Sequence, residues 1–194
     1  MGLPGEQDLL AERAELLETL DGLTDEEFAS GPTLCDEWAP RDVLAHLMGV
    51  DQRGDVYIRS FWNISKANNR IVADARSQSR ERLMHRARHW ATHPAPHVRL
   101  AAFALMGDIA THHQDIVRGL GKERQVPEAS ARAILREGIV LGGKRLLSHS
   151  VEPIDGGRSI GRGPKVRGTT EALGLWLSGR KGLEPELEFA SVPA

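Results

Sequence analysis

Amphipathic helical segments separated by proline and glycine constrain the fold of this chain more than any other feature. Residues 6–21 repeat apolar side chains every three or four positions, which is the spacing of one buried helical face. Pro40 stands where the first turn of a helix tolerates proline. Gly119 and Gly121 follow a later apolar segment, and glycine at that place commonly ends a helix. The pattern predicts a mainly α protein.

Further helices are expected over the rest of the first 142 residues. They cover residues 41–62, 73–92, 98–118 and 128–141. The first of these contains Gly49 and Gly54, at either of which it can bend, and Pro94 ends the second. Thr24 and Glu27 have the spacing of a capping box, which predicts a short helix between residues 6–21 and residues 41–62. We therefore expect a bundle of about four principal helices.

The pattern changes after residue 142. Residues 145–154 and 157–163 have the composition of two short strands joined by a glycine-rich turn, and residues 168–180 that of one more helix. We therefore divide the chain into a helical bundle, residues 1–142, and a small α+β tail, residues 143–194, packed on the bundle. The fold class is mainly α, a four-helix bundle with a short strand-strand-helix appendage.

Composition limits the classes of partner. The 194 residues carry a net charge of -2, so we expect neither nucleic acid nor a membrane surface as partner. No stretch reaches the roughly 18 apolar residues of a membrane span, and the N-terminus lacks a secretory signal, which predicts a cytoplasmic protein. Cys35 is the only cysteine, which excludes an internal disulfide. The expected partner is a small-molecule substrate, and a homodimer is compatible with the sequence.

A polar stripe within residues 107–121 is the first candidate site. At about 100° per residue of helix, Asp108, His112 and Asp115 lie within roughly 60° of one another, beside an apolar arc. His112 therefore lies at the border between core and polar face, where a bundle helix can direct a ligand inward. His46 has the same border position on the segment that follows Pro40.

If these two helices are neighbours, His46, Asp108 and His112 can converge on one divalent cation. Three protein ligands leave a position open for water or substrate, which is typical of catalytic zinc sites. Asp42 and Asp115 would then accept ring N–H groups and set the tautomers of the ligands. An acid and a histidine four residues apart also occur as an ordinary pair that stabilises a helix surface, and spacing alone does not separate the two interpretations.

Three stretches together resemble a known family. They are GLTDEEFASGPTLCDEWAPRDVLAHLMG (22–49), GDIATHHQDIVRGLG (107–121) and GRGPKVRGTTEALGLWLSGR (161–180). The chain is similar to the DinB-like superfamily, in particular to the branch that resembles the N-terminal domain of mycothiol-dependent maleylpyruvate isomerase.

The resemblance implies a DinB-like four-helix bundle that binds zinc or nickel. The ligands it implies are a histidine of the second long helix and an acid and histidine four residues apart on a later one, which match His46, Asp108 and His112. It also implies that the metal activates a low-molecular-weight thiol such as mycothiol, or water. The expected function is a metal-dependent isomerase or thiol S-transferase acting on a small electrophile.

Two other functions remain open at this stage. The first is a metal-dependent amide or ester hydrolase, in which metal-bound hydroxide is the nucleophile. The second is a non-catalytic helical bundle that binds a small molecule.

Several other residues have two interpretations each. His113 is either a buried, hydrogen-bonded core histidine or, like Arg53 and Arg82, a group that contacts the substrate or thiol. Cys35 is either a packed small side chain or a reactive thiol near a helix start. Four histidines recur at every fourth position, which suits a solvated helix face or a second metal site: His85, His89, His93 and His97.

Overall fold

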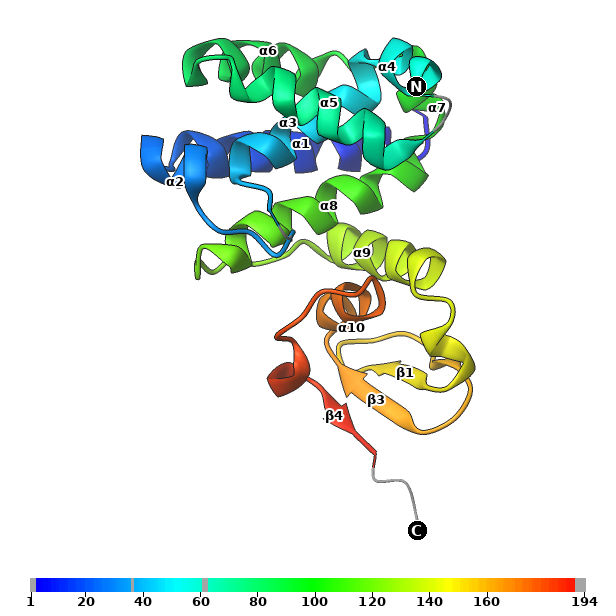
Figure 1. Ribbon diagram of the computed structural model, residues 1–194. Helices are drawn as coiled ribbons and strands as arrows, with labels where there is room; N and C mark the ends of the chain where they lie inside the picture. The colour runs from blue at the N-terminus through cyan, green and yellow to red at the C-terminus, as the bar shows by residue number, and fades with distance from the viewer. Residues whose placement is uncertain (1–2, 36, 61–62, 191–194) are drawn as a thin grey trace. The chain divides into compact units, whose positions relative to one another are not determined.

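The computed structural model describes residues 3–35, 37–60 and 63–190, and its contacts divide the chain into two compact units. Unit 1 comprises residues 1–105 and 112–124, and unit 2 comprises residues 106–111 and 125–194. The expected mainly α fold with a strand-containing C-terminal region is confirmed (Figure 1). None of the helices in the described residues combines the length and apolar character needed to cross a membrane.

Helices account for the regular structure of unit 1 in the part of the chain that is described. Their bounds are α1 (Glu6–Asp21), α2 (Asp25–Ser30), α3 (Pro40–Gln52), α4 (Gly54–Arg59), α5 (Ile64–Arg76), α6 (Arg80–Thr92), α7 (Pro96–Leu100) and α8 (Ala102–Gly119). Within the unit, α1 packs against α6, and α3 packs against α5 and α6. The middle of α8, residues 106–111, is grouped with unit 2, although the helix itself is continuous.

The ends of these helices follow local sequence rules. The predicted capping box is present, because the Thr24 hydroxyl accepts from Glu27 N while the Glu27 carboxylate accepts from Thr24 N. The prediction of one helix over residues 73–92 is wrong. The segment contains two helices, the end of α5 and all of α6. The Ser79 side chain caps α6 by accepting a hydrogen bond from Arg82 N.

Two more predicted segments are divided. The helix is interrupted at Arg53, between α3 and α4. This residue precedes Gly54, one of the two glycines at which we expected a bend. Gly49 lies within the continuous α3 instead, where a Cβ would come within 2.7 Å of the Ile71 side chain on α5. Residues 98–118 are divided at Ala101 into α7 and α8.

Unit 2 combines two helices with a four-stranded sheet. The helices are α9 (Glu128–Leu141) and α10 (Thr170–Leu177), with two 3-10 turns, η1 (Arg145–Leu147) and η2 (Glu184–Glu186). The strands are β1 (Ser150–Pro153), β2 (Ile160–Gly161), β3 (Lys165–Gly168) and β4 (Glu188–Phe189), in the order β2-β1-β3-β4. β1 is antiparallel to β2 and parallel to β3, and β3 is antiparallel to β4. We expected two of these strands; β3 and β4 are additional.

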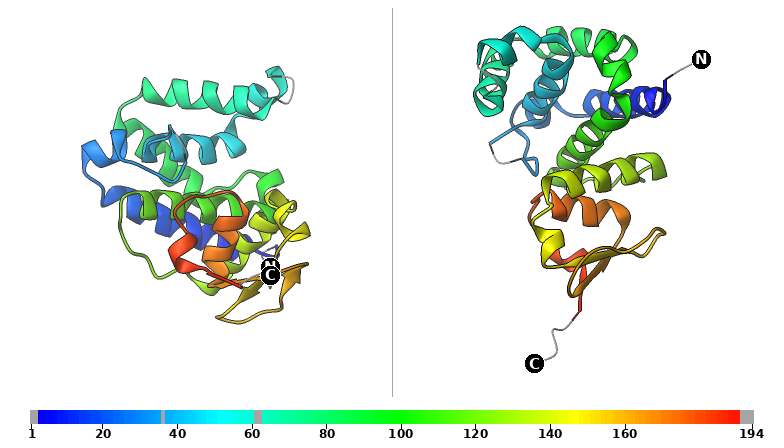
Figure 2. Two further views of the ribbon diagram at one scale, coloured as in Figure 1. Left: turned by 60° about the horizontal axis from the view of Figure 1, so that its bottom comes forward. Right: turned by 90° about the vertical axis from the view of Figure 1, so that its right-hand side faces the viewer.

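The helix α9 belongs to unit 2, whereas we expected the division of the chain after residue 142. The two helices α9 and α10 lie side by side (Figure 2). Their contact is unusually close, because a Cβ at Gly138 would lie 2.3 Å from the backbone oxygen of Gly174. Ile134 of α9 is fully buried in the same core cluster as Leu173 of α10. Glycine at the crossing point therefore lets α9 share the core of the C-terminal unit.

Candidate metal centre

Two histidines from distant parts of unit 1 face each other. His46 lies on α3 and His112 on α8, and each is 8% exposed. Their ring centroids are 5.0 Å apart with an interplanar angle of 77°, so the edge of one ring faces the other. The two helices are therefore neighbours at this point, which was the condition for a shared site.

Asp108 completes a set of three potential ligands. His46, Asp108 and His112 each offer one ligand atom, and these atoms all lie within 4.8 Å of one another. Asp108 precedes His112 by one turn of the continuous helix α8, so the helix itself sets their relative placement. Coordination of zinc would require side-chain rotations that bring each of the three atoms to roughly 2 Å from the ion.

The tautomer of His46 follows from its partner. Its Nδ1 lies 3.2 Å from Oδ1 of Asn68, which also accepts from the Tyr57 hydroxyl at 2.9 Å. An amide oxygen can only accept, so Nδ1 carries the hydrogen in the neutral ring. A ligand role of His46 therefore falls to Nε2, and Asn68 on α5 orients the ring.

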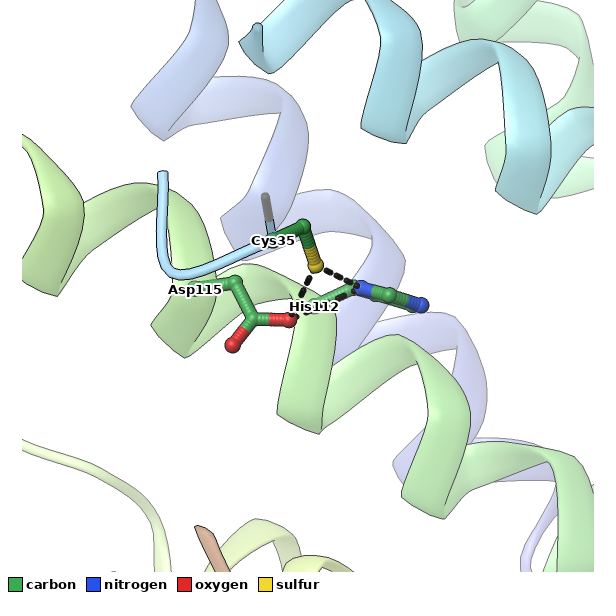
Figure 3. A group of neighbouring side chains, drawn as sticks. All are labelled: Cys35, His112 and Asp115. Carbon is green, nitrogen blue, oxygen red and sulfur yellow. Dashed lines mark hydrogen bonds and ion pairs between the residues drawn. The ribbon is translucent and has the colours of Figure 1, made fainter. Parts of the chain in front are cut away.

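The same logic applies to His112. Its Nδ1 lies 2.9 Å from Oδ2 of Asp115, one turn further along α8, and 3.4 Å from the Cys35 sulfur. The Cys35 thiol also donates to Asp115 Oδ2 at 2.9 Å. Figure 3 shows the other ring nitrogen of His112 pointing away from both. A carboxylate partner at Nδ1 leaves the ligand role to Nε2, as for His46.

Two neighbours of the histidines, Cys35 and Trp38, line an open cavity. Cys35 and Trp38 line a space of about 520 Å³ together with Arg41 and residues of the loop after α2. The Trp38 ring centroid lies 5.2 Å from that of His46 and 6.1 Å from that of His112. Trp38 thus lies beside both imidazoles and also lines the cavity.

The expected orienting role of Asp42 is corrected by the structure. Its carboxylate accepts from Arg76 at 2.8 and 3.1 Å and from the backbone of Ala39 at 3.0 Å. Asp42 therefore caps the start of α3 and binds an arginine of α5, while Asn68 holds the ring of His46. The helical wheel placed Asp42 beside His46 but carried no information on α5.

His113 belongs to a separate buried network and has no exposed surface through which to contact substrate. Its Nδ1 lies 2.8 Å from Glu12 Oε1, and its Nε2 lies 2.8 Å from the Thr19 hydroxyl. Arg124 pairs with Glu12 at 2.8 Å and with Glu15 at 2.5 Å. Of its two interpretations, the structure supports the core histidine.

Burial and charge set the protonation states in that network. Burial lowers the pKa of His113 and outweighs the opposing effect of the Glu12 carboxylate, so the neutral ring is favoured. For Glu12, burial acts to raise the pKa, but hydrogen bonds from His113 and Arg124 outweigh it and lower the pKa to about 2. Glu12 is therefore an anion at neutral pH.

The remaining sequence candidates lie elsewhere. Arg53 pairs with Asp55 and Asp74 at 3.4 and 3.3 Å, so its guanidinium is held by carboxylates near the α3–α4 junction. Arg82 is exposed on α6. Neither lines the cavity beside Trp38. Two sets of potential ligand atoms occur among the described residues, and neither includes the four histidines spaced by four, His85, His89, His93 and His97.

The sequence did not predict that Cys35 lies beside His112 or that Asn68 lies beside His46. Cys35 was expected either to pack or to react, but its contacts with His112 and Asp115 had no local signal in the sequence. Asn68 was not singled out at all. Only the approach of α5 to α3 places this asparagine against an imidazole.

Comparison with known proteins supports the resemblance seen in the sequence. The family model of the mycothiol maleylpyruvate isomerase N-terminal domain matches residues 9–88. The family assignment is confirmed for that segment, which contains His46, Cys35 and Asn68. The helix that carries Asp108 and His112 lies outside the match. Neither the curated proteins nor the solved structures provide a match to the chain.

Proposed function

We propose that the chain is a metal-dependent enzyme in which His46, Asp108 and His112 bind one divalent cation, zinc or nickel. The observation that carries the proposal is the orientation of the two imidazoles. Each has its Nδ1 against an oxygen acceptor, Asn68 or Asp115, so that Nε2 of both rings is the donor atom for a cation. Two neutral imidazoles and a carboxylate suit zinc or nickel.

The ligand number supports a catalytic role over a structural one. Structural zinc sites have four protein ligands, whereas three leave a position for a reactant. Trp38, which lies beside both histidines, also lines a cavity in which a small molecule could bind. A cation at this site would act as a Lewis acid and make a thiolate or hydroxide available at neutral pH.

A low-molecular-weight thiol is the favoured co-reactant. The support is the match of residues 9–88 to the N-terminal domain family of mycothiol maleylpyruvate isomerase. The proposed reaction is addition of the thiol to a small electrophile, either with retention of the product as a thioether or with elimination after isomerisation of an activated cis-alkene. The first outcome is an S-transferase and the second an isomerase.

The chain's own residues have defined roles in this proposal. Asn68 and Asp115 hold the two imidazoles in the tautomer that presents Nε2. Tyr57 donates to the same Asn68 oxygen and limits its rotation. Trp38 lies beside both rings, with its ring centroid 5.2 Å from that of His46 and 6.1 Å from that of His112.

Metal content tests the site directly. Untagged protein should contain about one equivalent of zinc or nickel per chain, or bind it at micromolar concentration. His112→Ala should lose that metal, since removing a ligand costs more than the 10–100-fold that removing its orienting partner costs. His85→Ala, which removes an exposed histidine of α6, is the matched control and should retain it. Equal metal binding by His112→Ala and the control would refute the proposal.

Product analysis separates the candidate activities. Metal-loaded protein is incubated with an activated cis-alkene, with and without mycothiol, and the products are identified by mass. Thioether or isomerised alkene that forms only with thiol and only with intact His112 supports the proposed function. Hydrolysis of an amide or ester without thiol identifies a hydrolase instead. Ligand binding that persists in both His46→Ala and His112→Ala identifies a non-catalytic binding protein.

A further inference from the structure

We infer that Cys35, His112 and Asp115 form a second binding position for a soft divalent cation such as Zn²⁺ or Cd²⁺. This position uses Nδ1 of His112, whereas the proposed enzymatic site uses Nε2. It includes the chain's single cysteine, which has no part in the proposed function. The inference does not depend on the chain being an enzyme.

The three ligand atoms already surround one point. The Cys35 sulfur lies 3.4 Å from His112 Nδ1 and 2.9 Å from Asp115 Oδ2, and Nδ1 and Oδ2 are 2.9 Å apart (Figure 3). Ligands of a tetrahedral zinc ion, with bonds of about 2.0–2.3 Å, are themselves about 3.3–3.6 Å apart. The atoms therefore need to separate by about 0.2–0.6 Å to admit the ion.

The ligand types match a soft cation. Thiolate, imidazole and carboxylate are the three side-chain ligands of zinc in proteins, and a thiolate selects against magnesium and calcium. Cys35 also lines the cavity of about 520 Å³, so the position has an entry path and room for a water as fourth ligand. Asp115 is fully buried, so a cation there would meet a carboxylate that water does not screen.

The backbone holds the two segments together. Leu34 N donates to the backbone oxygen of Asp115 at 3.0 Å, and the Thr33 hydroxyl accepts from Cys35 N at 3.1 Å. The loop also lies directly on α8, because a Cβ at Gly119 would come within 2.3 Å of the Thr33 Cα. Cys35 is therefore held against α8 without a metal, which lowers the entropy cost of ligand assembly.

The two positions exclude each other as long as His112 is a neutral ring. A neutral imidazole has one lone pair for a ligand bond, at Nε2 when Nδ1 carries hydrogen and at Nδ1 when Nε2 carries it. Binding at the Cys35 position transfers the ring hydrogen from Nδ1 to Nε2 and releases the thiol proton to solvent. One cation per chain is therefore expected, divided between the two positions.

Cobalt and cadmium titrations test the inference. The wild-type chain is titrated with Co²⁺ or Cd²⁺ in a buffer without competing thiols, and thiolate-to-metal charge-transfer absorption is recorded. His46→Ala removes a ligand of the other position only, so this variant should bind one equivalent and show the full charge-transfer absorption. Cys35→Ser should lose the absorption while it still binds a cation through His46.

The double variant His46→Ala with Cys35→Ser should bind no cation at the micromolar level. Circular dichroism confirms that each variant is folded. In the wild-type protein, Cd²⁺ should also protect Cys35 from alkylation, which tests the inference without any substitution. Cation binding to His46→Ala without charge-transfer absorption, or alkylation of Cys35 unaffected by Cd²⁺, would overturn the inference. Loss of metal from Cys35→Ser with retention in His46→Ala would instead refute the proposed enzymatic site.

Discussion

His112 and His113 are consecutive residues of one helix, and they belong to two chemically different regions. His112 lies against His46 and Trp38, and its Nδ1 lies against the Asp115 carboxylate and the Cys35 sulfur. His113 is fully buried between Glu12 and Thr19, with both nitrogens hydrogen-bonded. Burial alone does not distinguish them, since both are largely covered.

The difference lies in how each ring nitrogen is used. In the His113 network both nitrogens have oxygen partners, and Arg124 balances the charge of Glu12. Such an arrangement holds secondary-structure elements together, and it leaves neither nitrogen of His113 to bind a metal ion. At His112 the Asp115 carboxylate orients the ring through Nδ1, and in the proposed site Nε2 binds the cation. The His113 network should therefore respond to substitution in stability, and the His112 cluster in metal affinity.

The largest effect is expected from breaking the His113 network. Glu12→Ala leaves His113 and Arg124 without their shared carboxylate in a buried place, and should lower the free energy of unfolding by about 3–5 kcal/mol. Glu15→Ala removes the second carboxylate that pairs with Arg124. Because the Glu15 side chain is 42% exposed, this substitution should lower the free energy of unfolding by less than about 1 kcal/mol. Urea denaturation measures both. Similar losses in the two variants would contradict the structural role of Glu12.

Acid should weaken the same network. Because the pKa of Glu12 is about 2 in the fold and 4.5 without these contacts, its contribution is complete above pH 4.5 and is lost as the pH falls toward 2. The loss is on the order of 3 kcal/mol. Glu12→Gln has no such carboxyl to protonate, so its stability should fall less over this range. Urea denaturation at several pH values compares the free energies of unfolding of the wild-type protein and Glu12→Gln. An equal fall of both with pH would show that Glu12 does not contribute.

Metal affinity should respond to Asp115 and not to Asp42. Asp115→Asn weakens the acceptor that orients His112 and should reduce metal affinity about 10–100-fold. Asp42→Asn is the matched control, because it neutralises another buried carboxylate whose partners are Arg76 and the Ala39 backbone. Its effect should fall on stability alone. Isothermal titration calorimetry with Zn²⁺ measures the affinities. A comparable loss of zinc affinity in Asp42→Asn would show that Asp115 has no specific role in orienting His112.

The smallest effect is expected outside both regions. Arg82→Ala removes an exposed side chain of α6 and should change the free energy of unfolding by no more than about 0.5 kcal/mol. Metal affinity and any thiol-dependent activity should be unchanged, because Arg82 does not line the cavity beside Trp38. A substantial rise in the KM for the thiol would restore Arg82 as a contact residue.

Local signals predicted the helices well where a cap or a proline marks an end. The capping box of Thr24 and Glu27 and the proline at the start of α3 were both recognisable, because the backbone groups concerned lie within a few residues. The break between α5 and α6 was missed, since the arginine-rich segment has helical composition on both sides of Ser79. The extra strands β3 and β4 were missed because each is very short and depends on its partner strand.

The assignment of α9 to unit 2 also lay beyond local signals. Its sequence has the amphipathic pattern of any bundle helix. The close approach at Gly138 and Gly174, which are distant in sequence, is what joins it to α10. A glycine in a helix shows that close packing is allowed, but does not show which partner approaches.

The sequence by itself determined which residues share a helical face. Asp108, His112 and Asp115 are placed together by the geometry of one helix, and so is the separation of His112 from His113 onto different sides. Only the tertiary structure decided what each face meets. His46, Asn68 and Cys35 reach α8 or each other across long stretches of chain, and their meeting depends on the packing of whole helices. Helix periodicity is a property of neighbouring residues, whereas the second partner of an imidazole is a property of the fold.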